Sequence, residues 1–122
     1  MSYNIDTWKT KKLIDLKIPL SAFYKHPRAD WHPEIKKKDG KTFVLVCGCD
    51  QEILGEIRDE VLSVVVINMQ GEGSGTFYKW ILEPALSEST GELEAVLVWE
   101  GGDSISRLTV KDGTVEDKEI DL

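Results

Sequence analysis

Hydrophobic and polar residues alternate along most of this chain, and many of the hydrophobic positions are Val or Ile. A period of two places successive side chains on opposite faces of a strand, and β-branched residues are frequent in strands. The pattern therefore predicts a mainly β protein. Strands are expected at about 12–20, 42–49, 52–59, 62–70, 92–100, 104–111 and 114–120.

Short turn sequences connect these expected strands. Asp112-Gly113 suits the two positive-φ positions of a two-residue hairpin loop, and Gly101-Gly102 forms a similar pair. Asp59-Glu60 is a weaker turn signal of the same length. Turns this short join antiparallel neighbours, so an antiparallel sheet is expected.

The segment from Ser74 to Ser87 is ambiguous. Phe77, Trp80 and Ile81 fall at helical spacing, but Pro84 would lie inside that helix and cost about 3 kcal/mol. The run Thr-Phe-Tyr-Lys-Trp-Ile also has high strand propensity. We therefore expect a strand that ends near residue 83, and keep a helix near 76–87 as the alternative.

An internal similarity suggests a duplication. Residues 43–53 align with 95–105 at an offset of 52, and after one inserted residue 57–67 aligns with 110–120. Both copies are expected to form strand, turn, strand, turn, strand. A weaker sequence similarity precedes each copy, at 16–22 and 82–88.

These patterns predict one domain over residues 1–122, with repeat halves at about 12–70 and 76–122. Two related four-stranded units would give eight antiparallel strands in a small barrel or a strongly coiled meander. If the ambiguous segment is helical, the alternative is an α+β fold of the order β3-α-β3. An open sheet would leave a strand edge available, so a homodimer is also compatible with the sequence.

Composition limits the compartment and the class of protein. The 122 residues are 41% hydrophobic, which suits one globular core, and no apolar run approaches the roughly 18 residues of a membrane-spanning helix. The first 16 residues lack a basic segment followed by an apolar block, and two cysteines make no disulfide framework. A cytoplasmic protein without a membrane segment is expected.

Charge is unevenly distributed along the chain. Residues 1–42 hold ten Lys or Arg and five Asp or Glu, a net charge of +5, whereas the other 80 residues hold five bases and 17 acids, a net charge of −12. An acidic surface repels phosphate backbones and attracts basic proteins. Nucleic acid is therefore not expected as a ligand, and the basic run at 36–41 is interpreted as solvated lysines around an Asp-Gly turn.

Both histidines and both cysteines lie between residues 26 and 49, which raises the question of a metal. His26, His32, Cys47 and Cys49 together form a Cys2His2 donor set that zinc accepts. Their spacing differs from that of a standard zinc unit, and the cysteines align with Trp99 and Gly101 in the second copy. The alternative interpretation is packing by small cysteines and a loop ordered by the histidines.

No sequence pattern predicts an enzyme. A nucleophilic Cys47 or Cys49 would need His26 or His32 as its base and Asp30 to orient that base, and nothing in the spacing fixes such an arrangement. The glycine-rich segment 70–76 lacks the residues of a phosphate-binding loop and is interpreted as the connection between the copies. No catalytic residues are assigned.

The leading functional hypothesis is a small acidic interaction protein, inhibitor-like or immunity-like, that binds a basic protein. Trp31, in a loop between Asp30 and His32, is the best candidate for an exposed aromatic anchor. The other candidate contact residues are acidic: Asp30, Glu52, Glu56, Asp59 and Glu60. The alternative hypothesis is a small-molecule or zinc-binding β domain that uses His26, His32, Cys47 and Cys49.

Overall fold

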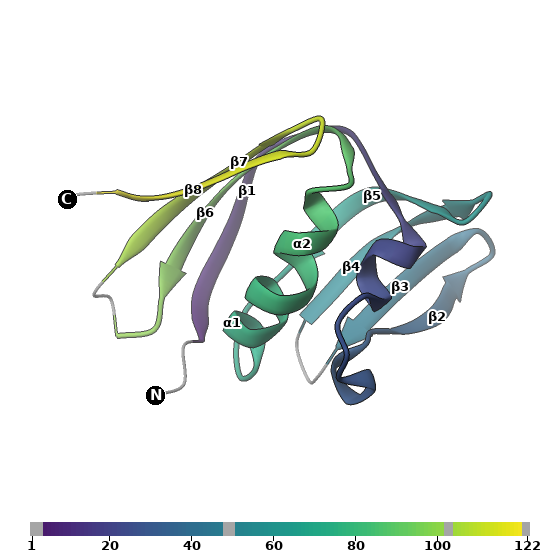
Figure 1. Cartoon of the computed structure of the whole chain (residues 1–122), viewed down its shortest axis with the longest axis horizontal. Helices are drawn as coiled ribbons and strands as arrows, with labels where there is room; N and C mark the ends of the chain where they lie inside the picture. The colour runs from purple at the N-terminus through teal and green to yellow at the C-terminus, as the bar shows by residue number, and fades with distance from the viewer. Residues whose placement is uncertain (1–3, 48–50, 102–103, 121–122) are drawn as a thin grey trace.

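The protein is built on one eight-stranded antiparallel sheet, seen here in a computed structural model that describes residues 4–47, 51–101 and 104–120. The order across the sheet is β2-β3-β4-β5-β1-β6-β7-β8 (Figure 1). The expected mainly β fold with eight antiparallel strands is confirmed. Their bounds are β1 Ile5–Pro19, β2 Glu34–Asp39, β3 Thr42–Cys47, β4 Gln51–Arg58, β5 Val61–Asn68, β6 Thr90–Trp99, β7 Ile105–Lys111 and β8 Thr114–Ile120.

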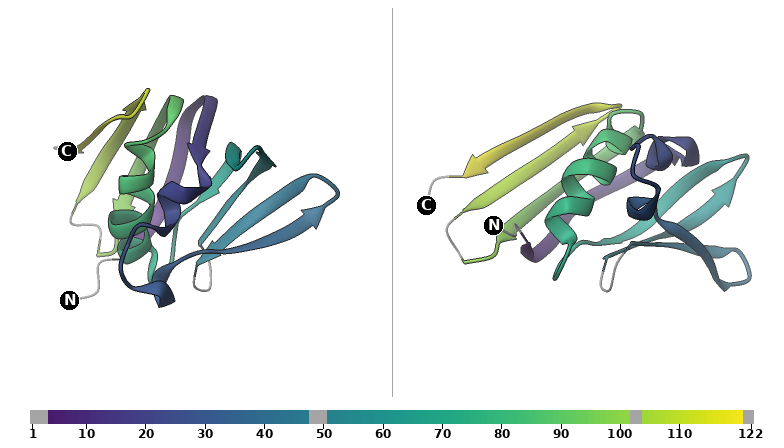
Figure 2. Two further views of the ribbon diagram at one scale, coloured as in Figure 1. Left: turned by 45° about the vertical axis from the view of Figure 1, so that its right-hand side comes forward. Right: turned by 60° about the horizontal axis from the view of Figure 1, so that its bottom comes forward.

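The sheet is open and strongly twisted, which confirms the meander and not the closed barrel. Figure 2 shows that β2 and β3 lie at one end of the molecule and β7 and β8 at the other. The long strand β1 holds the middle, because it pairs with β5 near its end and with β6 along most of its length.

One helical segment lies across a face of this sheet (Figure 1). It consists of α1 (Ser74–Phe77), one π-helical turn η3 (Tyr78–Leu82) and α2 (Glu83–Leu86). Alternate residues of the strands bury their side chains on the face that carries the core, such as Leu93, Ala95 and Leu97 of β6. The helical segment adds Phe77 and Ile81 among its buried residues.

The strand expected over 76–83 is wrong, and the helix of the alternative is present. The β3-α-β3 order of that alternative is wrong, because five strands precede the helical segment and three follow it. Pro84 falls in the first turn of α2, directly after the π turn in which the Glu83 N–H donates to the Tyr78 carbonyl. The widened turn separates the proline ring from the preceding carbonyls, and Pro is tolerated in the first turn of a helix. The penalty that argued against a helix is therefore avoided.

Two further boundaries differ from the expectation. β1 begins at Ile5 and not near residue 12, and β2 was not expected at all. All six residues of β2 are exposed, so its sequence shows no alternation of buried and exposed positions. Two single turns of 3-10 helix, η1 (Leu20–Tyr24) and η2 (Ala29–Trp31), connect β1 to β2.

The two aligned copies have the same secondary structure. Residues 43–67 form β3, β4 and β5, and residues 95–120 form β6, β7 and β8. Their second turns also agree, because Asp59 and Asp112 have φ values of 53° and 45°. The weaker similarity upstream of each copy is not reflected in the structure, because 16–22 lies in β1 and η1 whereas 82–88 is largely helical. Five strands precede the helical segment, and three follow it.

Within the described ranges, no helix has both the length and the apolar character needed to cross a membrane.

Candidate functional site

Three aromatic rings meet where the β1–β2 connection approaches the helical segment. His26 stacks on Trp31 with 4.7 Å between ring centroids and an interplanar angle of 28°. The edge of His26 also meets Trp80 of η3 at 5.8 Å. Trp80 is 49% exposed, and His26 and Trp31 are half-buried. We call these three residues the aromatic corner.

An ion pair covers part of this corner. The Arg28 guanidinium lies 4.6 Å above the centroid of the Trp31 ring, and its nitrogens donate to the two carboxylate oxygens of Asp30 at 3.3 and 2.9 Å. These hydrogen bonds lower the pKa of Asp30, so its carboxylate stays ionised. Asp30 and Arg28 therefore form an ion pair at the edge of the corner.

Both histidines stabilise the loop through hydrogen bonds to the backbone. The Arg28 N–H donates to Nδ1 of His26 at 3.1 Å, so that nitrogen carries no proton when the bond is made. Nε2 of His32 lies 2.6 Å from the His26 carbonyl and donates its proton there. The Tyr24 hydroxyl closes the loop by donating to the Pro33 carbonyl at 3.1 Å. The loop is rigid for these reasons.

The predicted metal site cannot be assembled from the described residues. Cys49 lies outside them, and so does the side chain of Cys47 at the end of β3. No group of three potential ligands comes together elsewhere in the described chain. A metal on the histidines would have to use Nε2 of His26 and Nδ1 of His32, because the other two ring nitrogens bond the backbone. The zinc and nucleophile hypotheses therefore stay predictions.

A groove of about 350 Å³ adjoins the aromatic corner. Asp30 and Trp31 form one wall, and Thr76, Phe77 and Ile81 of the helical segment form the other, with Gly73 and Gln51 completing the lining. Gln51 is 1% exposed, and its Nε2 donates to the carbonyls of Gln70 and Glu72 at 2.9 and 3.0 Å. This glutamine fixes the connection that leads into α1 against β4.

The predicted contact residues fall into two groups. Asp30 and Trp31 line the groove. Glu52 and Glu56 project from the opposite face of β4, because the alternate residues Gln51, Ile53 and Gly55 are buried. Asp59 and Glu60 form the exposed β4–β5 turn. The fold therefore brings only the first pair together with the aromatic corner.

Trp80 and Gln51 were not predicted from the sequence. Any of the four tryptophans could have been partly exposed, and Trp31 was preferred to Trp80 because it lies in a loop, whereas Trp80 lies in the segment that was expected to be a strand. Gln51 carries no recognisable signal, since its role depends on a connection 19 to 21 residues further along the chain.

The other two tryptophans serve packing. Trp8 and Trp99 both meet the buried ring of Tyr78 edge to face, at 6.1 and 6.0 Å. Their indole N–H groups donate to side-chain hydroxyls of the protein itself, those of Thr10 and Ser106. Of the four tryptophans only Trp80 is exposed, whereas Trp31 and Trp99 are half-buried and Trp8 is buried.

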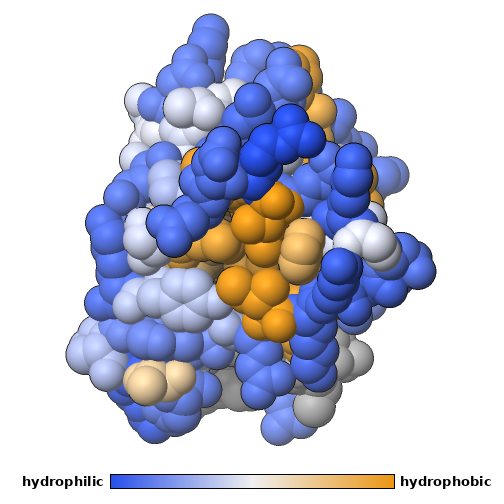
Figure 3. Space-filling view, turned by 90° about the vertical axis from the view of Figure 1, so that its right-hand side faces the viewer, coloured by the Kyte–Doolittle hydropathy of each residue, from blue (hydrophilic) through white to orange (hydrophobic). Residues whose placement is uncertain are grey.

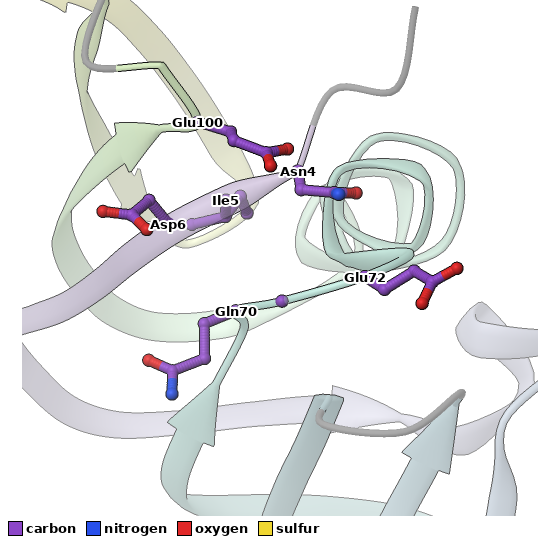
Figure 4. Close-up of a pocket in the computed structure, with 7 residues that line it drawn as sticks. Asn4, Ile5, Asp6, Gln70, Glu72 and Glu100 are labelled. Atoms are coloured by element: carbon purple, nitrogen blue, oxygen red, sulfur yellow. The ribbon is translucent and has the colours of Figure 1, made fainter.

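A second pocket, of about 390 Å³, lies at the start of β1 (Figure 4). Its lining includes Asp6, Glu72 and Glu100. Figure 4 shows that the three carboxylates do not converge on one point, and that Asp6 and Glu72 point away from each other. The arrangement gives an acidic surface and not a cation site.

Hydrophobic surface also gathers on the side of the molecule that carries β2–β5, where Figure 3 shows an apolar island with hydrophilic margins. The large hydrophobic side chains exposed on these strands are Ile35, Val65 and Val66.

No protein-family model matches the chain, and comparisons with curated proteins and with solved structures found no match either. Function therefore has to be inferred from the chemistry of the aromatic corner and its groove.

Proposed function

We propose that this protein is a small acidic binding domain that recognises a basic partner protein through the aromatic corner. The observation that carries the proposal is the 49% exposure of Trp80 beside the stacked pair His26 and Trp31. Tryptophan residues at the centre of interfaces contribute a disproportionate share of binding energy. A tryptophan held half-exposed by neighbouring rings is a suitable anchor.

The chemistry of the corner favours a positively charged partner group. Lys or Arg placed over an exposed tryptophan gains about 0.5–1 kcal/mol from the cation–π interaction. The ionised carboxylate of Asp30 lines the adjoining groove, and Glu72 contributes its carbonyl to the Gln51 hydrogen bonds nearby. A basic side chain entering the groove would compete with Arg28 for Asp30 and stack on the rings.

Rigidity and net charge support the same proposal. The backbone hydrogen bonds of His26 and His32 order the loop before any partner arrives, which lowers the entropy that binding must overcome. The net charge of −7 would accelerate encounter with a basic protein, and this acceleration decreases as salt increases.

The test is capture of partners from an extract of cells that express the protein, followed by identification by mass spectrometry. We expect a basic protein that is retained at low salt and released at about 0.5 M salt, where the screening length is only a few ångströms. Trp80→Ala should reduce its affinity about thirtyfold, as expected for an interface anchor worth about 2 kcal/mol.

Ile14→Ala is the matched control, because Ile14 is a comparably exposed hydrophobic residue on β1. It should retain the partner. Capture that is equal for wild type and Trp80→Ala, or a captured protein without basic character, would contradict the proposal.

Native mass spectrometry tests the zinc alternative on the same material. The zinc hypothesis requires one zinc ion per chain that is lost on chelation and in Cys47→Ser/Cys49→Ser. The proposed partner binding requires neither, so it should survive both treatments unchanged.

A further inference from the structure

The open sheet has two edge strands, β2 and β8, and each has one side without a neighbouring strand. Figure 2 shows them at opposite ends of the molecule. Within the described ranges, residues 34–39 and 114–120 make no backbone hydrogen bonds beyond those of the sheet. All six residues of β2 and all but Val115 of β8 are exposed. Such edges are templates for pairing with another chain.

The two edges carry opposite charge. β2 has three consecutive lysines, Lys36 to Lys38, and two acids, a net charge of +1, whereas β8 has three acids and one lysine, a net charge of −2. The acids are Glu116, Asp117 and Glu119. Like edges of two copies would repel, and unlike edges would attract. The basic strand β2 and the acidic strand β8 thus lie at opposite edges of one sheet.

The even number of strands allows β2 of one copy to pair with β8 of another without turning either copy over. All neighbours are antiparallel and there are eight strands, so β2 and β8 run in opposite directions. A second copy in the same orientation would therefore place its β2 antiparallel to β8 of the first. The core face of both sheets would stay on the same side, and the ladder would continue without reversal.

One register satisfies charge on the outer face. Lys36 pairs with Val44 and Glu116 with Thr109, and both project away from the buried face that contains Leu45 and Leu108. Placing Glu116 opposite Lys36 of the second copy also places Lys118 opposite Glu34, because antiparallel partners step in opposite directions. Both cross-strand pairs then have opposite charges.

We infer that copies of this protein associate edge to edge, with β8 of one copy beside β2 of the next. The occupant of each edge is a second copy of this chain. Because the two surfaces differ, the interface is heterologous and extends into rings or short linear assemblies. This association goes beyond the proposed partner binding, since neither edge contains a residue of the aromatic corner.

Sedimentation velocity over a concentration series tests the inference. Wild type should form dimers and larger species at about 20 mM salt, with an association constant at least about tenfold lower at about 500 mM salt. Lys36→Glu/Lys37→Glu gives two acidic edges, and Glu116→Lys/Glu119→Lys gives two basic edges. Each variant alone should lose association by about tenfold or more.

Mixing the two variants provides the decisive comparison. Every edge of one variant is then opposite in charge to the edges of the other, so association should return in the mixture. Lys9→Glu/Lys11→Glu on the central strand β1 is the matched charge control and should associate like wild type. Trp80→Ala should also associate normally, which separates this inference from the proposed function.

If the wild type remained monomeric at low salt, the inference would be wrong. The edge charges would then protect the protein against edge-to-edge pairing. An assembly that persists unchanged in both charge-reversal variants would overturn it as well. Restoration in the mixture and not in the separate variants is the result that supports it.

Discussion

The strands β3–β5 and the strands β6–β8 are two sets of three adjacent antiparallel strands on one sheet, and their outer faces differ. On the buried face Leu45 and Leu97 occupy aligned positions, and both are completely buried. On the outer face of the first unit, Val44, Leu54 and Val66 lie side by side on β3, β4 and β5. The corresponding row of the second unit is Val96, Arg107 and Lys118.

This difference shows which face is constrained by the fold. The buried face has to fill one continuous core, so both units have aliphatic residues there, with Ser106 as a buried polar exception in the second unit. The outer face of the second unit accepts charge, and Arg107 forms a 3.1 Å ion pair with Glu94 on it. The first unit keeps an apolar row with Val66 47% exposed. The outer faces can therefore diverge without cost to the core.

The largest expected effect comes from a glycine in each unit. A Cβ on Gly55 would lie 2.1 Å from the Ser63 carbonyl oxygen, and one on Gly91 would lie 2.1 Å from that of Asp15, where φ is also +90°. Either change to Ala should lower the free energy of unfolding by about 4 kcal/mol or more, measured by urea denaturation.

Gly40→Ala is the control for these two substitutions. Its φ is +46° and no atom lies within 4 Å of the added Cβ, so only a backbone cost of about 1 kcal/mol is expected. If all three variants lost the same stability, the close approach of the strands would not be the cause.

The aligned leucines should contribute almost equally. Leu45→Ala and Leu97→Ala each remove a completely buried side chain, and each should cost about 3 kcal/mol of unfolding free energy. Urea denaturation followed by circular dichroism measures both. A difference above about 1.5 kcal/mol would mean that the two positions are not equivalent in packing.

The second turns differ in sequence, which gives a smaller effect. Asp59 and Glu60 both have positive φ, at 53° and 62°, whereas the other unit uses Asp112 and Gly113. Glu60→Gly removes the strain of a side chain in this conformation, but glycine also increases the conformational entropy of the unfolded chain. The net gain in the free energy of unfolding should be about 0.5 kcal/mol. Thermal denaturation would show a higher melting temperature.

Arg58→Gly is the control for that turn, since Arg58 belongs to β4 and has no positive φ. It should lower the melting temperature because glycine weakens a strand. A gain in both variants would argue against strain at Glu60.

The smallest effect concerns pH and involves Glu83 of α2, which lies near Asp117 of the second unit. Burial, and then the charge of Asp117, raise the pKa of Glu83. The folded protein therefore binds a proton more tightly than the unfolded chain, and stability falls as pH rises from the ordinary Glu pKa of about 4.3 through the raised value. Glu83→Gln should flatten this dependence and add a few tenths of a kcal/mol at neutral pH.

Denaturation at several pH values measures the effect, with Glu88→Gln as the exposed control from the same region. A Glu83→Gln variant with the same pH dependence as wild type would rule out this carboxylate as the source.

The pattern of alternation and short turns predicted seven of the eight strands, although β8 has no fully buried residue. It failed for β2, where both faces are exposed, and for the helical segment. The error at 76–83 came from treating Pro84 as part of a regular helix. The π turn before it depends on packing against the sheet, which local propensity does not describe.

The candidate site was predicted only in part for the same reason. Trp31 and Asp30 were recognisable because they lie together in one loop. Trp80 joins them from a residue some 50 positions away, and only the packing of the helical segment creates that contact. The acids Glu52, Glu56, Asp59 and Glu60 were grouped with Trp31 by charge, but the alternation of β4 directs them elsewhere.

The most direct test of the proposed binding site follows the four tryptophan indole N–H signals by NMR while a captured basic partner, or a lysine- and arginine-rich peptide as its substitute, is added. Trp8 and Trp99 donate to the hydroxyls of Thr10 and Ser106 in the same chain and serve as internal references. The proposal predicts that the Trp31 and Trp80 signals shift together and saturably while the references stay in place. Unchanged Trp31 and Trp80 signals in the presence of bound partner would contradict it.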